Sequence, residues 1–172
     1  ETIEELENGR LHHYSTYFSD GEGGIEDSQT LTVSCGSDPC QTLGLADVDG
    51  DGFSDLVVSQ AVSRAPAGYR HHVKVYRALD AGGFTETAQT WYHFDSFSSD
   101  PLDVVGLADV NGDQNADLVI REYDQLNWYY SRSLIHVYLS NGRDSFEAQD
   151  QEWAAVDHHY YIEVVFGLGD SN

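Results

Sequence analysis

Asp47-Val48-Asp49-Gly50-Asp51-Gly52-Phe53-Ser54-Asp55 is the stretch that decides the fold of this chain. It returns 62 residues later as Asp109-Val110-Asn111-Gly112-Asp113-Gln114-Asn115-Ala116-Asp117. Side chains that carry oxygen stand at positions 1, 3, 5 and 9 of both copies, which is the spacing of a loop wrapped around a hard cation such as Ca²⁺. Two carboxylates about 4 Å apart repel by roughly 4 kcal/mol at an effective dielectric constant near 20. Because a divalent cation turns that repulsion into attraction, both loops are predicted to bind Ca²⁺.

The following residues show what kind of loop this is. An EF-hand loop needs a bidentate glutamate at position 12, where this chain has Val58 and Ile120. The β-branched runs after the loops favour strands over helices, so each loop is predicted to join two strands of a hairpin. An acidic, glycine-rich turn without an ion is the alternative, and repetition in register argues against it. The predicted side-chain ligands are Asp47, Asp49, Asp51, Asp55, Asp109, Asn111, Asp113 and Asp117, and the predicted carbonyl ligands are those of Phe53 and Asn115.

The repetition extends well beyond the acidic loops. Gly44-Leu-Ala-Asp-Val returns at Gly106, Val75-Tyr76 returns at Val137-Tyr138, and Trp91 returns at Trp153. Turn residues separate four candidate strands in each unit, and four strands in about 60 residues is the size of a propeller blade. The candidate strands lie near 41–48, 54–62, 71–79 and 84–94, and near 103–110, 116–123, 132–140 and 146–156.

The segments 44–58 and 106–120 resemble the FG-GAP/VCBS repeat, which is found in integrin α-chain propellers and in many secreted bacterial proteins. The resemblance implies an all-β fold of about three four-stranded antiparallel propeller-blade repeats, each about 61–62 residues long. In that family the acidic hairpin loop joins the first two strands of a blade and binds Ca²⁺. The resemblance also implies a scaffold for adhesion or ligand binding that rarely carries catalytic residues. Only Phe166-Gly167 keeps the Phe-Gly pair, which argues against close kinship with integrins.

The repeat divides the chain into four predicted parts. These are the second half of a repeat at 1–34, full repeats at 35–96 and 97–157 with calcium loops 47–55 and 109–117, and the start of a further repeat at 158–172. The last part opens another acidic loop, so Asp170 and Asn172 are predicted ligands. When the sequence is read from Asn172 on through Glu1, Glu5 takes the place of Asp117 and Leu6 that of Leu118.

Three explanations fit such interrupted ends. The chain is a piece of a longer propeller, it closes on itself, or its ends complete a repeat between neighbouring molecules and build a filament by heterologous contacts. Unpaired strand edges invite added strands. The predicted partners are therefore other copies of the chain or further repeats of it, together with a protein or carbohydrate ligand.

Composition limits the partners and the location. The formal net charge is −22, from 30 acidic and 8 basic residues, which disfavours nucleic acid and anionic membranes. The sequence contains no apolar run of the length that a membrane span needs. Cys35 and Cys40 stand in Cys-Gly-Ser-Asp-Pro-Cys, and a disulfide between them is favoured over a metal or redox site. A secreted or cell-surface location is expected.

Other candidate sites are less specific. The pairs His12-His13, His71-His72 and His158-His159 alternate between strand faces, so no pair can chelate a transition metal alone. A packing role is favoured for Trp91 and Trp153, whereas Trp128-Tyr129-Tyr130 lies in a connection suited to a sugar ligand. No nucleophile or phosphate-loop motif stands in the sequence. A non-enzymatic adhesion module is predicted, with a filament protomer or the non-catalytic part of a secreted hydrolase as alternatives.

Overall fold

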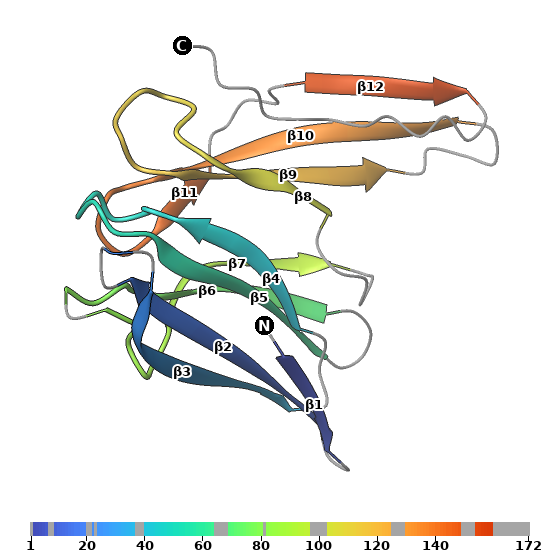
Figure 1. Cartoon of the computed structure of the whole chain (residues 1–172). Coiled ribbons are helices and arrows are strands. Elements are labelled where there is room, and N and C mark those ends of the chain that lie inside the picture. Colours follow the sequence, from blue (N-terminus) through green and yellow to red (C-terminus); the bar gives the residue numbers. More distant parts are fainter. Residues whose placement is uncertain are drawn as a thin grey trace.

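The computed structural model describes residues 2–6, 9–19, 22, 24–36, 40–63, 69–80, 82–96, 103–124, 130–148 and 154–159. Within these residues the regular structure is all β, in three antiparallel sheets that follow one another along the chain (Figure 1). The first sheet contains β1 (Thr2–Leu6), β2 (Gly9–Ser19) and β3 (Ile25–Gly36). The second contains β4 (Cys40–Ala46), β5 (Asp55–Ser63), β6 (Tyr69–Tyr76) and β7 (Gln89–Ser96). The third contains β8 (Asp103–Ala108), β9 (Asp117–Asp124), β10 (Tyr130–Ser140), β11 (Phe146–Ala148) and β12 (Ala154–His159).

The second and third sheets repeat one strand order and one register. The second runs β4-β5-β6-β7, and the third runs β8-β9-β10 with β11 and β12 along the other edge of β10. Gly44 pairs with Val57 after an irregularity in β4, and Gly106 pairs with Val119 after the same irregularity in β8. Each acidic loop joins the first two strands of its sheet, so the predicted strand–loop–strand hairpins are confirmed. No helix among the described residues is long and apolar enough to cross a membrane.

The fourth strand of each repeat is shorter than the sequence predicts. In the second sheet β7 begins at Gln89, and Phe84 forms only an isolated bridge with Ala78. The tight turn before it places Gly82 and Gly83 at positive φ, and the exposed residues Glu86 and Thr87 then leave the sheet. In the third sheet the same edge consists of two strands, β11 and β12. A continuous strand over 84–94 or 146–156 is therefore wrong.

The register of the first sheet corrects the expected equivalence of the two chain ends. His12 pairs with Ile3 and His13 with Thr2, as His71 pairs with Ala61 and His72 with Gln60. β1 therefore corresponds to the second half of β5. Glu5 and Leu6 lie beside the β1–β2 turn, whereas Asp117 and Leu118 begin β9 at the opposite end of its hairpin. The predicted equivalence of Glu5 with Asp117 and of Leu6 with Leu118 is wrong, because a strand fixes its partners by backbone register.

Successive sheets pack face to face through two apolar cores. The core between the second and third sheets contains Val48, Val57, Val73, Val75, Trp91, Ala116, Leu118, Ile120 and Phe146. The core between the first and second sheets contains Tyr14, Val33, Cys35, Leu56, Val58 and Tyr76. β5 contributes to both, since alternate side chains of a strand point to opposite faces: Leu56 and Val58 face the first sheet, and Val57 faces the third.

The same alternation recurs in the third sheet. Leu118 and Ile120 of β9 face the second sheet, as Leu56 and Val58 of β5 face the first. The second sheet thus turns one face toward the first sheet and the other toward the third, and β9 likewise buries Val119 on the face that points away from the second sheet. The unbroken apolar run in each second strand is explained by this double burial.

The Cys35–Cys40 disulfide is confirmed, with a Cα–Cα distance of 5.8 Å. It links the end of β3 to the first residue of β4, so it joins the first sheet to the second. Tyr14 and Thr42 also hydrogen-bond across this boundary at 2.7 Å. The bond that composition predicted as a local loop closure therefore ties two sheets together.

Replacing Leu118 by alanine is expected to destabilise the protein by about 3 kcal/mol, because the side chain is fully buried between two sheets and its removal leaves a cavity. Leu45→Ala is the matched control, since Leu45 is 62% exposed and its loss should change the free energy of unfolding by less than about 0.5 kcal/mol. Urea unfolding followed by tryptophan fluorescence measures both. Equal losses in the two variants would contradict the packing described for Leu118.

Candidate metal centre

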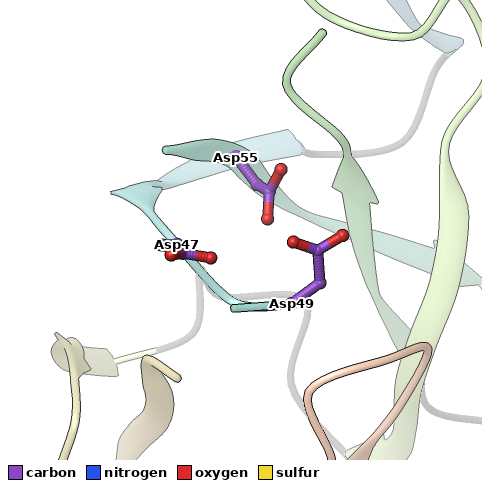
Figure 2. A group of neighbouring side chains, drawn as sticks. All are labelled: Asp47, Asp49 and Asp55. Carbon is purple, nitrogen blue, oxygen red and sulfur yellow. The ribbon is translucent and has the colours of Figure 1, made fainter. Parts of the chain in front are cut away.

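Three carboxylates from the two ends of the first acidic loop converge on one another. Asp47 follows β4, Asp49 lies two residues further on, and Asp55 begins β5. One carboxylate oxygen of each lies within 4.8 Å of those of the other two. Figure 2 shows the three side chains arranged around the loop. The antiparallel pairing of Ala46 with Asp55 closes the loop and brings its first and last ligands together.

Backbone amides of the loop donate hydrogen bonds to its own carboxylates. Asp47 accepts hydrogen bonds from the amides of Gly50 at 2.7 Å and Gly52 at 2.8 Å. Asp51 accepts one from the amide of Phe53 at 2.8 Å. Such aspartate-to-backbone contacts favour tight turns over regular structure. They order the loop and fix the directions of its carboxylates.

The last aspartate of each loop accepts hydrogen bonds from two separate parts of its sheet. Asp55 is fully buried and accepts hydrogen bonds from the amides of Val48 at 3.2 Å and Ala78 at 2.8 Å. Its carboxylate therefore connects the loop to the segment after β6. Asp117 repeats the arrangement, accepting from the amide of Val110 at 3.0 Å and from that of Ser140 at 2.8 Å.

Burial and mutual repulsion make the first site costly to ionise. Burial raises the pKa of Asp55 to about 6, although the amides of Ala78 and Val48 act in the opposite direction. Burial and the neighbouring Asp51 carboxylate also raise the pKa of Asp49. Burial raises the pKa of Asp117 in the second loop. In contrast, the pKa of Asp109 is lowered, first by the hydrogen bond from the Gln114 amide.

Arg77 is a functional contact that the sequence analysis did not identify. Its guanidinium lies 3.4 Å from the Asp49 carboxylate and 5.7 Å from the centre of the Trp91 ring. It also donates a hydrogen bond to the carbonyl of Arg143 in the third sheet. The equivalent residue of the second repeat is Leu139, so no repeated signal could reveal this role. One cation thus faces a group of three carboxylates, and most of their charge stays uncompensated.

The second loop has the same pattern of amide-to-aspartate hydrogen bonds as the first, but it carries fewer charged side chains. Asp109 accepts from the amides of Gly112 at 2.6 Å and Gln114 at 2.8 Å. Asn111 replaces an aspartate and donates to Asp113 at 2.9 Å, which removes one negative charge from the loop. Gln114 has φ 76, where Gly52 has φ 90. This left-handed conformation is strained for any residue with a Cβ.

The first loop is also built into the boundary between the second and third sheets. The Asp47 carbonyl accepts a hydrogen bond from the amide of Ala116 at 2.7 Å. The Val48 carbonyl accepts one from the hydroxyl of Ser140 at 2.5 Å. Gly50 has φ 77, which favours glycine, and a Cβ at this position would lie 2.5 Å from Oδ1 of Asn115, so the Asn115 side chain would have to move aside.

The predicted ligands are distributed unevenly. Asp47, Asp49 and Asp55 come together, whereas the Asp51 carboxylate turns back to the Phe53 amide. The predicted ligands of the second loop keep the same positions along its hairpin; they are Asp109, Asn111, Asp113, Asn115 and Asp117. The backbone amide of Asn115 donates a hydrogen bond to the Asp113 carboxylate at 2.8 Å. Asp170 and Asn172 lie outside the described residues. Ser140 is a further contact that appears only when sheets pack together.

Trp91 and His71, two of the tryptophan and histidine candidates that the structure describes, have packing roles. Trp91 is buried and packs against Phe146 at a ring-centre distance of 5.2 Å, so its packing role is confirmed. His71 is buried and stacks on Phe94, while its neighbour His72 is only partly buried, as expected for opposite strand faces. Trp128, Tyr129 and Trp153 lie outside the described residues.

The donor set of the first loop suits a hard divalent cation. It offers carboxylate oxygens, which are the ligands that Ca²⁺ prefers, and both oxygens of Asp47 are already oriented by backbone amides. Three carboxylates lie within 4.8 Å of one another, and burial, with smaller contributions from the charges of Asp49 and Asp51, raises the pKa of Asp55 to about 6. A bound cation would lower the cost of ionising them.

Residues 41–73 match the family model of the FG-GAP repeat. The match begins in β4, contains the whole first acidic loop and ends within β6. The predicted resemblance to the FG-GAP repeat is therefore confirmed for this part of the chain. No curated protein and no solved structure matches the chain.

The Asp55 carboxyl is expected to titrate with a midpoint near pH 6 when divalent ions are chelated. Since its folded-state pKa lies above the ordinary 3.8, the native state binds this proton more tightly than the unfolded chain. The free energy of unfolding should therefore fall as the pH rises from about 4 through about 6. Carboxyl-carbon NMR of Asp55 measures the midpoint directly. In saturating Ca²⁺ the midpoint should move below 3.8, and a midpoint near 4 in chelator would contradict the burial cost.

Gly52 and Gln114 stand at the sixth position of the two loops, and placing each residue type in the other loop should change the stability of the protein in opposite directions. Gln114→Gly relieves a left-handed glutamine and should stabilise the metal-free protein by roughly 0.5–1 kcal/mol, after the entropy that glycine adds to the unfolded chain is subtracted. Gly52→Gln should destabilise it by a similar amount. A Cβ at position 52 meets nothing within 4 Å, so the effect isolates backbone strain. Thermal unfolding in chelator tests the pair, and changes of the same sign would count against it.

Proposed function

We propose that this chain, as the carrier of an FG-GAP repeat, is an extracellular β-propeller-type module stabilised by Ca²⁺, which binds a protein or carbohydrate and catalyses no reaction. The observation that carries the proposal is the convergence of Asp47, Asp49 and Asp55 in a loop that lies within the FG-GAP match. The same backbone frame recurs in the second loop, which supports a second ion there.

Ca²⁺ would be held by oxygen atoms of both loops. The ligands proposed for the first ion are the side chains of Asp47, Asp49, Asp51 and Asp55 and the carbonyl of Phe53. Those proposed for the second are Asp109, Asn111, Asp113 and Asp117 with the carbonyl of Asn115. A bound ion would supply positive charge where burial makes ionisation of the carboxylates costly. Extracellular calcium modules bind the ion with dissociation constants of about 10⁻⁴–10⁻³ M. Asn111 leaves the second loop with less charge, so weaker binding is expected there.

The effect of the first ion would extend beyond its own hairpin. The backbone carbonyls of Asp47 and Val48 accept hydrogen bonds from Ala116 and Ser140 of the third sheet. A cation that fixes the loop would therefore fix these two acceptors as well. Calcium would stabilise the boundary between the second and third sheets, and its role would be structural.

The disulfide supports an extracellular location. Cys35 and Cys40 are joined, and such bonds persist mainly in oxidising compartments. The formal net charge of −22 is compatible with a solvated acidic surface, and it disfavours nucleic acid as a partner.

A second candidate function is that of a structural protomer in an extracellular filament. The observation that favours it is the stack of sheets itself, because each internal boundary uses the same two faces in the same order. A stack of this kind can be extended by further sheets at either end. Heterologous contacts that do not close produce filaments.

Asp49→Ala should lower the melting temperature in millimolar Ca²⁺ and change it little in chelator. The carboxylate is a proposed ligand, whereas in the metal-free protein its repulsion from neighbouring carboxylates offsets its contact with Arg77. A shift of about 2–4 °C per kcal/mol lost is expected for a chain of this size. Thermal unfolding with and without chelator, together with calcium titration calorimetry, measures the effect.

Asp80→Ala is the charge-matched control, since Asp80 is an exposed turn residue outside both loops. It should leave calcium binding unchanged. Equal destabilisation by Asp49→Ala in calcium and in chelator would show that Asp49 is not a ligand. Calorimetry that detects no calcium binding by the wild-type chain would overturn the metal site as a whole.

A further inference from the structure

Two histidines from neighbouring strands of the second sheet face each other. His72 lies in β6 and His93 in β7, and the antiparallel register of these adjacent strands (Figure 1) sets the two residues directly opposite. Their ring centres are 6.1 Å apart, with an angle of 35° between the ring planes. Among the strand pairings that the structure describes, this is the one that sets a histidine opposite a histidine. Sequence alone does not reveal it, because the pair comes from different strands.

Both rings project from the face of the second sheet that points away from the third sheet. Val73, next to His72, lies in the core between the second and third sheets, and Phe94, next to His93, packs against that core. Because alternate side chains of a strand point to opposite faces, the two histidines lie on the other face. His72 is partly buried and His93 is exposed, so a dissolved ion can reach the space between the rings.

The nitrogens of the two imidazoles are not used by the fold. Among the residues that the structure describes, no hydrogen bond reaches the ring of His72 or that of His93. Burial, followed by the charge of Lys74, lowers the pKa of His72. The His72 ring is therefore mainly neutral at pH 7, and neutral imidazole is the form that binds metal ions.

The two cations closest to the pair are engaged elsewhere. The Lys74 amine donates a hydrogen bond to the Gln60 side chain at 2.6 Å, and Gln60 belongs to β5, on the side of β6 opposite to β7. The Arg70 guanidinium donates to both carboxylate oxygens of Asp95, at 2.8 and 3.1 Å. A positive ion between the rings would therefore meet a lysine drawn toward β5 and an arginine whose charge is balanced by a carboxylate.

The corresponding positions of the other two sheets do not require histidine pairs. In the first sheet the register places His13 opposite Thr32, and these side chains form a hydrogen bond at 3.0 Å. In the third sheet it places Leu134 opposite Ala155, which stand 62 positions after His72 and His93. The repeated architecture therefore forms with a hydroxyl or with two apolar residues at this place, and the facing imidazoles are particular to the second sheet.

We infer that His72 and His93 together bind one divalent transition-metal ion, of the class to which Zn²⁺ and Cu²⁺ belong. Residues directly opposite each other in antiparallel strands have Cβ atoms about 4.5–5.5 Å apart, so both rings can reach a common point above the sheet. Because a Zn–N bond is about 2.0–2.1 Å long, two nitrogens on one ion lie at most about 4.2 Å apart. Rotation about χ2, which is broad for histidine, brings rings at the observed spacing into that range.

This histidine site differs in chemistry from the acidic loops. Imidazole nitrogens suit Zn²⁺ and Cu²⁺, whereas Ca²⁺ takes oxygen ligands. Cu²⁺ is expected to bind more tightly than Zn²⁺, following the general order of affinities for such sites. Two protein ligands leave the other coordination positions to water or to a donor atom of a partner. The ion would also link β6 to β7, and neither ligand lies in an acidic loop, so the site does not depend on the calcium role proposed above.

Calorimetric titration of the full chain with ZnCl₂ tests the site, in millimolar CaCl₂ so that Zn²⁺ does not enter the acidic loops. The wild type should bind one equivalent that both His72→Leu and His93→Ala lose. Each variant introduces one member of the pair that the third sheet has at this place, Leu134 or Ala155, so the sheet should still form, and an unchanged circular dichroism spectrum checks this. Titration with CuCl₂ should give the same pattern with a lower dissociation constant.

His13→Leu is the matched control, since His13 holds the corresponding position of the first sheet but faces Thr32. It should bind Zn²⁺ like the wild type. NMR of the histidine ring protons gives a readout on the unaltered chain, in which the resonances of His72 and His93 should shift together. Undiminished binding by either variant, no binding by the wild type, or shifts confined to other histidines would overturn the inference. Calcium titration of the same samples, which should not distinguish the variants from the wild type, separates this result from a failure of the proposed calcium site.

Discussion

The buried carboxylates of Asp55 and Asp117 are the contacts on which the rest of the structure depends. Each accepts one hydrogen bond from a backbone amide at the start of its acidic loop, and a second from an amide at the end of the third strand (Ser140) or just after it (Ala78). A buried carboxylate without such partners would be strongly destabilising. The two hydrogen bonds therefore fix where the loop begins, where the second strand begins and how the next hairpin approaches. The same loop keeps the carboxylate oxygens of Asp47, Asp49 and Asp55 close together.

The same hydrogen-bonded hairpin occurs in the second and third sheets, which pack against each other. The second strands of the second and third sheets, β5 and β9, bury apolar side chains on both of their faces. The first acidic loop takes part in that packing through the carbonyls of Asp47 and Val48. The proposed metal site and a sheet boundary thus share the same backbone, so that binding of an ion and packing of the two sheets are expected to reinforce each other.

The chain differs between its two repeats at the positions where the neighbours differ. Arg77 faces Asp49, Trp91 and the carbonyl of Arg143 across a formed boundary. Leu139, at the same position of the second repeat, packs against an apolar cluster of Val119, Ile135 and Val137. The acidic loops differ as well, since Gln114 adopts a left-handed conformation that glycine adopts in the first loop. The second loop therefore combines less charge with more backbone strain.

The sequence by itself determined the all-β class, the two hairpin loops and the disulfide, because spaced oxygen ligands, glycine turns, β-branched runs and two nearby cysteines are local signals. It also predicted the convergence of Asp47, Asp49 and Asp55, since a closed hairpin brings its ends together. Only the tertiary structure decided the roles of Arg77 and Ser140, the register that separates Glu5 from Asp117, and the break in the fourth strands. Those features depend on contacts between residues far apart in the chain, and a one-dimensional pattern specifies which side chains will be buried without specifying which sheet will bury them.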